Sequence, residues 1–300
     1  MNFTINGMGG GSGCSEVRPP TVAGQFYEGD PARLQAHLEK LRVEIGKVDA
    51  LPNVRALILP HAGYVYSGRT ALHGMLRAAA GKYKRAVVIA PTHRVPFHGL
   101  ALCSYKAYGS PLGDVNIDAE AVKTLCGYRL PMLQTMDRAH DNEHALEVEI
   151  PLFQNVFGDL PIIPIIAGHI DSHLARKLAE SLKSLWTPDT LWIISSDFTH
   201  YGHSFGYVPF KSDVQEKLRE LDLGAADLIM KCDLDGFVRY IEETGATICG
   251  RAAIMVLLAA IEGNGEINGE LVEYSTSGAL TGDWSHCVSY AAIAFNDKGR

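Results

Sequence analysis

Short apolar runs alternate with amphipathic stretches along most of the chain, and this alternation predicts strands and helices in turn. Strands are expected where apolar and β-branched residues run together, at Arg55–Leu59, Arg85–Ala90, Leu100–Ser104, Ile162–Ala167, Leu191–Ser195, Gly269–Ser275 and Cys287–Phe295. Helices are expected at helical spacing of apolar residues, over Asp30–Val43, Arg69–Ala80, Asp118–Leu125, Asn142–Phe157 (interrupted at Pro151), Ser172–Leu185, Ser212–Met230, Leu234–Glu243 and Gly250–Ile261. The pattern favours an α/β fold with a mainly parallel, mixed central sheet flanked by helices.

The start of the chain differs in composition from everything that follows it. Residues 1–17 contain the Gly/Ser cluster Gly7–Gly13 and are expected to form a flexible tail. No later linker, repeat or composition break divides the sequence, so residues 18–300 are expected to fold as a single domain. The 300 residues are 47% hydrophobic, which is sufficient for one large α/β core.

Charge and cysteine usage narrow the classes of function. The net charge of −7 is spread over short patches of both signs, so nucleic acid is not an expected partner. No apolar run reaches the roughly 18 residues of a transmembrane helix, and the start lacks the pattern of a signal peptide. The six cysteines are scattered without a CxxC pair, which argues against a disulfide framework. We therefore expect a cytoplasmic protein without membrane contact. Walker A, GxGxxG, HExxH and GxSxG motifs are absent, so no nucleotide cofactor is expected.

Metal-type side chains follow three of the apolar runs. His61, His93 and Asp197 each come shortly after a predicted strand, and His200 lies three residues beyond Asp197. In open α/β sheets, ligands and catalytic groups gather just past the carboxyl ends of the strands. Imidazole suits zinc, copper, iron and nickel. The sequence therefore predicts a site at this edge of the sheet.

Each of these residues also has a structural explanation. His61 can be a turn histidine satisfied by backbone groups, and Asp197 with the two serines before it can cap a helix. Cys249 stands where a helix begins, which favours the thiolate, but a lone cysteine there is more often a small buried residue. Arg251 either binds an anionic substrate group or pairs with a surface acid. Tyr64 either lines a pocket or packs in the core.

The EHxxE run is ambiguous in the same way. Glu143, His144 and Glu147 lie close together on a predicted helix and can support a site with acidic groups. An ordinary solvated helix face is the favoured interpretation. Other histidines, His98 and His169 among them, carry no local signal.

Taken together, the segments resemble the Memo family, known in bacteria and archaea as AmmeMemoRadiSam system protein B. The matching stretches are AGQFYEGD, LPHAGYVYSG, PTHRVP, DNEHALEVEIP, SSDFTHYG, TICGR and VSYAA. Each is short, but they occur in order over nearly all of the chain beyond the tail, and the ordered set is highly specific. The resemblance implies the fold of class III extradiol dioxygenases, which hold non-haem Fe(II) with two histidines and a glutamate.

Carried over residue by residue, the resemblance implies metal ligation by His61, His93 and Cys249. It also implies an acid–base role for His200, with Asp197 beside it as an orienting group. Cys249 thereby changes from a packing residue to an expected ligand. A thiolate in place of the carboxylate favours one iron or copper ion, with zinc as a further candidate. Ring-cleaving activity is therefore not simply inherited.

The pocket residues and the function are implied in the same way. Phe26 stands where animal members have a tryptophan in a cleft described as binding phosphotyrosine peptides, and the expected pocket comprises Phe26, Tyr64, His144 and Arg251. The expected function is that of a redox metalloenzyme acting on a small organic substrate. The alternatives are an interaction protein that holds a peptide or a partner, such as a radical-SAM or other AmmeMemoRadiSam protein, and a metal-dependent hydrolase.

Overall fold

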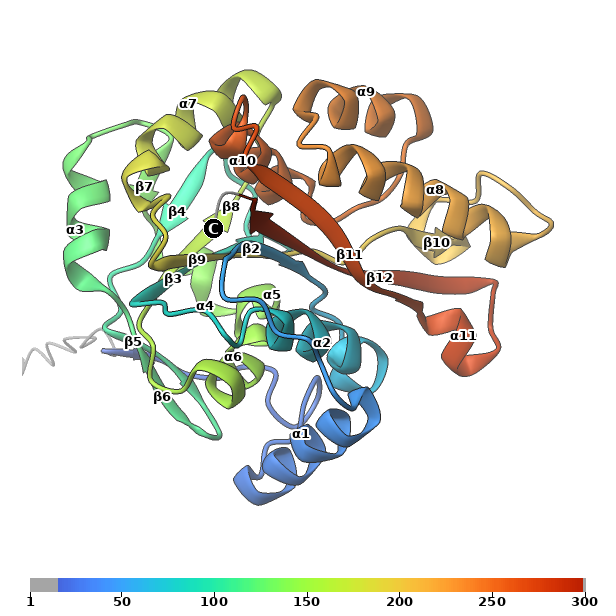
Figure 1. The fold of residues 1–300 in the computed structure, drawn as a ribbon, viewed down its shortest axis with the longest axis horizontal. Helices are drawn as coiled ribbons and strands as arrows, with labels where there is room; N and C mark the ends of the chain where they lie inside the picture. Colours follow the sequence, from blue (N-terminus) through green and yellow to red (C-terminus); the bar gives the residue numbers. More distant parts are fainter. Residues whose placement is uncertain (1–15, 299–300) are drawn as a thin grey trace, which may run out of the picture.

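A mixed sheet forms the centre of the computed structural model, which describes residues 16–298 (Figure 1). The strand order is β10-β12-β2-β9-β3-β8-β4-β7, with β11 paired to β12. The strands are β2 (Val54–Leu59), β3 (Arg85–Pro91), β4 (Leu100–Leu102), β7 (Leu133–Thr135), β8 (Ile162–Ala167), β9 (Thr190–Ser195), β10 (His200–Gly202), β11 (Ile267–Thr276) and β12 (His286–Asp297). The central strands β2, β9, β3 and β8 are parallel, while β12 and β4 join them antiparallel. The predicted mixed α/β sheet is confirmed.

Helices cover both faces of this sheet (Figure 1). They are α1 (Pro31–Ile45), α2 (Arg69–Arg77), α3 (Ala119–Gly127), α4 (Asp137–Asp141), α5 (His144–Glu147), α6 (Glu149–Phe157), α7 (Ser172–Leu182), α8 (Val214–Met230), α9 (Leu234–Thr244), α10 (Arg251–Ile261) and α11 (Ser277–Thr281). Short helical turns lie at η1 (Tyr64–Gly68), η2 (Lys183–Leu185) and η3 (His203–Phe205). Most match the predicted helices in position.

Alternation along β2 explains the two layers. Ala56 and Ile58 belong to the hydrophobic cluster that includes side chains of α7, α8, α9 and α10. Leu57 and Leu59 belong to the cluster that includes α1, α2, α5 and α6. Because successive side chains of a strand point to opposite faces, a run that is apolar throughout fits a strand covered on both sides.

The helical region around Pro151 differs from the prediction in where it breaks. Instead of one interrupted helix over Asn142–Phe157, α5 and α6 follow one another with Val148 between them, and α4 lies just before this range. Pro151 is the third residue of α6. In the first turn of a helix a missing N–H breaks no intrahelical bond, so the proline is tolerated there and does not cause the break.

A second, small sheet was not predicted. It joins β1 (Val17–Arg18), β5 (Ala107–Ser110) and β6 (Gly113–Asn116) in the order β1-β5-β6. Val17, the last residue of the predicted tail, pairs with Ala107, whereas residues 1–15 lie outside the described part of the chain. Such short strands leave too little apolar alternation to be recognised in a sequence.

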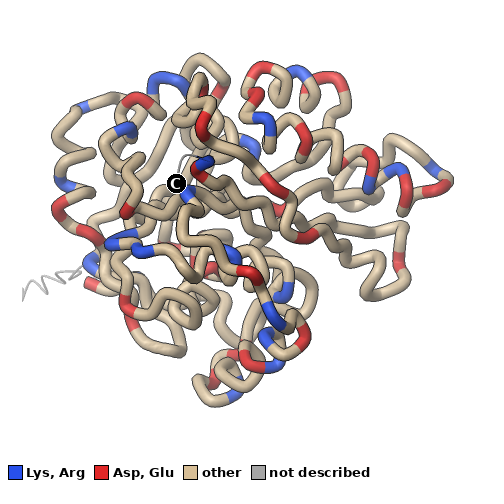
Figure 2. Tube along the Cα trace, viewed as in Figure 1, with Lys and Arg blue, Asp and Glu red and all other residues tan. Residues whose placement is uncertain are grey.

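Several global expectations can be compared with the described residues. Within residues 16–298, no helix has both the length and the apolar character needed to cross a bilayer. The described cysteines Cys103, Cys126, Cys232, Cys249 and Cys287 all carry free thiols, and Cys14 lies outside the described range. Basic and acidic residues are interspersed along the trace (Figure 2).

Candidate metal centre

His61 stands just past the carboxyl end of β2, two residues beyond Leu59, and its side chain is held from two sides. It is 2% exposed, and its backbone N–H donates to Asp197 Oδ1 at 2.8 Å. The ring Nδ1 lies 2.8 Å from Ser195 Oγ at the end of β9. Burial is the main cause that lowers the pKa of His61 well below its usual value, and electrostatic interaction with the neighbouring His93 lowers it further. The ring is therefore a neutral imidazole, which is the form that binds metals.

Ser195 connects His61 to a buried carboxyl group. Its Oγ lies 2.7 Å from the Ala145 carbonyl oxygen and 3.0 Å from Glu149 Oε1. Burial, partly offset by the hydrogen bond with Ser195 and reinforced by the charge of Asp197, raises the pKa of Glu149 well above its usual range, which favours the protonated carboxyl group. Ser195 can then donate to the Ala145 carbonyl and accept from both Glu149 and His61 Nδ1. This arrangement places the proton of His61 on Nδ1 and leaves the Nε2 lone pair free.

His93 is oriented by Glu143 in a similar way. Both its backbone N–H and its ring Nδ1, at 2.8 Å, contact the carboxylate of Glu143, which is 1% exposed. Burial alone would raise the pKa of Glu143, but the hydrogen bonds and charge of His93 outweigh it and hold that pKa below its usual value. A carboxylate on Nδ1 directs Nε2 of the same ring toward a metal.

His144 completes a cluster of three imidazoles. One ligand atom each from His61, His93 and His144 lie within 4.8 Å of one another. The ring centroids are 5.3 Å apart for His61 and His93, 5.6 Å for His61 and His144, and 4.7 Å for His93 and His144. Burial, followed by His93, lowers the pKa of His144 to about 4. Nitrogen donors this close together could hold one metal ion.

The thiol of Cys249 reaches the same cluster from the other end of the sequence. Its Sγ lies 3.3 Å from His61 Nε2 and accepts the backbone N–H of Asp197 at 3.2 Å. Burial, followed by the charge of Asp197, raises the pKa of Cys249 well above its usual value. Burial of the thiol therefore outweighs the effect expected from the start of α10 at Arg251. A nearby cation is what would favour the thiolate here.

The predicted acid–base pair is arranged differently from the expectation. His200 Nδ1 lies 3.0 Å from the Thr247 carbonyl oxygen, and its backbone N–H donates to Thr247 Oγ1 at 2.9 Å. Thr247 therefore orients His200, and Asp197 does not fill this role. The carboxylate of Asp197 instead accepts the backbone N–H of His61. Burial, partly offset by the charge of His200, raises the pKa of Asp197.

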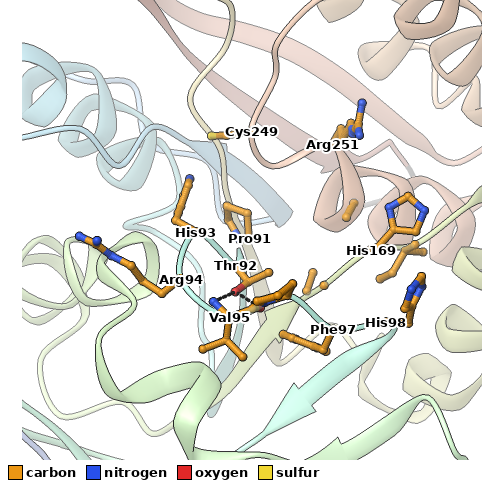
Figure 3. A pocket seen from close by; sticks show the side chains of 15 residues that line it. Pro91, Thr92, His93, Arg94, Val95, Phe97, His98, His169, Cys249 and Arg251 are labelled. Carbon is orange, nitrogen blue, oxygen red and sulfur yellow. Dashed lines mark hydrogen bonds between the residues drawn. The ribbon is translucent and has the colours of Figure 1, made fainter. Parts of the chain in front are cut away.

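The expected pocket residues lie in three environments. The ring of Phe26 packs against His144 with centroids 4.9 Å apart. Tyr64 is 2% exposed, belongs to a core cluster and donates its hydroxyl to the Val148 carbonyl at 2.8 Å. Arg251 is exposed and lines a cavity that also contains His93 and Cys249 (Figure 3). Tyr64 therefore packs in the core, which was the structural alternative.

The acidic run around His144 is buried, so the solvated-face interpretation is wrong. Glu143 is 1% exposed and Glu147 is 0% exposed. Glu147 forms an ion pair with Arg18, which is also 0% exposed, and accepts the hydroxyl of Tyr27 at 2.7 Å. The supporting role of Glu143 was the less favoured alternative, and the roles of Glu149 and Ser195 were missed, although both glutamates fall in the motif DNEHALEVEIP. Only their burial distinguishes them from surface acids.

Two histidine rings just past the carboxyl ends of β2 and β3, joined by His144 of α5 and the thiol of Cys249, define an α/β protein with a candidate metal centre. Comparison with known proteins gives the family: a model described as Memo-like protein matches residues 18–294. The chain belongs to the Memo family, as the resemblance indicated. It is 32% identical over 294 residues to a MEMO1 family protein of Methanopyrus kandleri, covering 93% of this chain and 98% of that protein. It is 35% identical over 288 residues to a MEMO1 family protein of Methanococcoides burtonii, with 92% and 99% covered.

Proposed function

We propose that this Memo-family protein holds one non-haem iron or copper ion through His61, His93 and Cys249 and acts as a redox metalloenzyme on a small organic molecule. The observation that carries the proposal is the convergence of three imidazoles within 4.8 Å and of a sulfur 3.3 Å from His61 Nε2. Imidazole and thiolate donors together suit iron, copper and zinc rather than magnesium or calcium. His144 is a fourth donor available at the same place.

The bound ion would supply Lewis acidity and, for iron or copper, electron transfer. The chain supplies the remaining parts. Ser195 and Glu143 hold His61 and His93 with Nε2 available, and the burial of His61 excludes water from that side. His200 donates its Nδ1 proton to the Thr247 carbonyl, so Nε2 is the atom that can accept or deliver a proton.

Metal analysis of protein purified without chelators tests the proposal. We expect wild type to retain about one iron or copper ion per chain, and the His61→Ala and Cys249→Ser variants to lose most of it, since each removes a ligand. His173→Ala is the matched control, because His173 is an exposed histidine on α7. Equal, small metal contents in wild type and His61→Ala would overturn the proposal.

Spectroscopy separates the two possible ligand sets. A thiolate-to-metal absorption band that vanishes in Cys249→Ser and persists in His144→Ala supports ligation by His61, His93 and Cys249. If wild type lacks this band and His144→Ala loses the metal, the third ligand is His144 and not Cys249. Activity of the zinc form alone would favour hydrolysis, and partner binding that survives loss of all metal would favour an interaction protein.

A further inference from the structure

A cavity of about 470 Å³ opens beside the histidine cluster and continues past it (Figure 3). Its walls come from the loop after β3, from residues 167–170 at the end of β8, and from the start of α10. His93 and Cys249 lie on one side of it. Cavities of about 300–1,000 Å³ are typical of small-molecule sites. The side chains at the far end therefore decide which molecules fit beside the metal donors.

Three nitrogen-rich side chains line the cavity away from the candidate metal donors. They are Arg251, His98 and His169, and Figure 3 draws them on the side opposite His93 and Cys249. The rings of His98 and His169 meet edge to face with centroids 5.1 Å apart. Among the described residues that line the cavity there is no carboxylate. Arg251 is exposed, and its guanidinium forms no ion pair within residues 16–298.

Backbone pairing fixes the two histidines in place. His98 and His169 form a parallel bridge, in which His169 N donates to Phe97 O at 2.7 Å and Gly99 N to His169 O at 3.2 Å. Gly168 makes this approach possible, because a Cβ there would lie 2.3 Å from the Phe97 carbonyl oxygen. Two backbone hydrogen bonds thus fix the segments that carry both rings. Less conformational entropy is then lost when a ligand binds.

We propose that Arg251, His98 and His169 form an oxyanion-binding subsite for the carboxylate or phosphate group of a small organic molecule. The planar guanidinium fork matches both groups with two parallel hydrogen bonds. Imidazole adds an N–H donor even when it is uncharged. A second metal ion is disfavoured at this place, because the unpaired guanidinium repels a cation. The remainder of the bound molecule would extend along the cavity toward His93 and Cys249.

Use of this subsite as a substrate anchor rests on the proposed metal function, whereas anion binding itself does not. The test therefore uses full-length protein stripped of metal with a chelator and dialysed into low-salt buffer. Benzoate and inorganic phosphate are titrated calorimetrically, with benzamide as the neutral counterpart of benzoate. We expect saturable binding of benzoate, phosphate or both at one site, and no binding of benzamide. Preference for one anion assigns carboxylate or phosphate as the natural group.

Variants locate the binding. Arg251→Gln should weaken anion binding at least about tenfold, because it removes a charge-assisted hydrogen bond, and His98→Gln and His169→Gln should each weaken it less. Arg94→Gln is the control of equal charge change, since Arg94 also lines the cavity but extends away from Arg251, His98 and His169 in Figure 3. Its affinity should match wild type. Equal weakening by Arg94→Gln and Arg251→Gln would overturn the assignment, as would binding of neither anion.

Metal retention distinguishes the two proposals. If wild type holds no metal but binds an anion through Arg251, only the proposed function fails. If wild type holds metal but binds neither benzoate nor phosphate, only the oxyanion subsite fails. Arg251→Gln should retain the metal content of wild type, since Arg251 is not among the proposed ligands.

Discussion

Two buried glutamates support the histidine cluster, one as a charged carboxylate and the other as a neutral carboxyl group. Glu143 is held as a carboxylate by His93 and by the backbone N–H groups of His93 and Ala145. Glu149 reaches the cluster only through Ser195, and its Oε2 has no hydrogen-bond partner among the described residues. An ionised carboxylate cannot be left in that position without a large desolvation cost, whereas a neutral carboxyl group can. The two glutamates therefore act differently on the cluster: Glu143 acts on His93 through its charge, and Glu149 acts on His61 through Ser195 without one.

Glutamine substitutions at the two positions should separate these contributions. Glu143→Gln should lower metal affinity about 10–100-fold, because it removes the charge that orients and polarises His93. Glu149→Gln should leave metal affinity unchanged, because it replaces one neutral group with another of similar shape. Competition against a chromogenic chelator measures both, and circular dichroism verifies the fold. Equal losses in the two variants would contradict the assigned charge states.

At the scale of elements, a buried ion pair attaches the N-terminal segment to α5. Arg18 of β1 contacts Glu147 of α5, and it donates to the carbonyl oxygens of His140 at 3.0 Å and Glu143 at 2.8 Å. Glu147 in return accepts the backbone N–H groups of Thr21 and Val22 at 2.9 Å. These bonds cross more than a hundred residues of sequence, and α5 carries His144. The segment before α1 thus stabilises the helix that supplies part of the cluster.

Breaking this ion pair should be costly. Glu147→Gln leaves the Arg18 guanidinium buried without a counter-charge, so we expect a loss of about 3–5 kcal/mol in the free energy of unfolding. Urea denaturation followed by fluorescence measures it. Glu39→Gln, at an exposed position of α1, should change the same free energy by less than about 0.5 kcal/mol. Similar values for the two variants would show that Glu147 contributes no more than a surface acid.

The same pair gives a pH dependence with a defined sign. Burial alone would raise the pKa of Glu147, but the Arg18 charge and the hydrogen bonds outweigh it and hold the pKa below its usual value. A lowered folded-state pKa contributes stability above the unfolded-state value of about 4.3, and that contribution disappears as the pH falls through the folded value. The difference in unfolding free energy between wild type and Glu147→Gln should therefore be constant above about pH 5 and shrink on acidification. A difference that grows in acid would contradict the assigned direction.

At the scale of the whole molecule, the candidate donors connect both layers of helices to the sheet. His61 and His93 follow β2 and β3, His144 belongs to α5 in one layer, and Cys249 precedes α10 in the other. His61 and Cys249 are 188 residues apart. An ion held by these side chains would cross-link segments that otherwise meet through packing and hydrogen bonds.

Metal loading should accordingly raise the melting temperature of the intact protein. Free metal at a hundredfold excess over its dissociation constant stabilises the folded state by about 2.7 kcal/mol, which corresponds to several degrees. Differential scanning calorimetry should detect the shift in wild type and in His173→Ala but not in His61→Ala. A shift of equal size in His61→Ala would assign the stabilisation to some other binding site.

The sequence predicted those parts of the molecule that depend on local pattern. Apolar runs located the central strands, and the residues just past them located His61 and His93 at one edge of the sheet. The orienting roles of Ser195 and Thr247 could not be predicted, and that of Glu143 was only the less favoured alternative, because each depends on a contact between segments distant in sequence. Composition alone does not distinguish a buried acid from a solvated one. His98 and His169 were missed for the same reason, since only the backbone bridge brings them together.

The order of the donors along the chain has a consequence for biosynthesis. The ribosome releases the three imidazoles long before the sulfur of Cys249, which at about 5–20 residues per second arrives many seconds later. A metal ion that met the nascent polypeptide early would find only nitrogen ligands, none of them yet held in position by β9 or α10. With the proposed ligand set, metal loading would therefore have to follow translation, when Cys249 can join the three imidazoles.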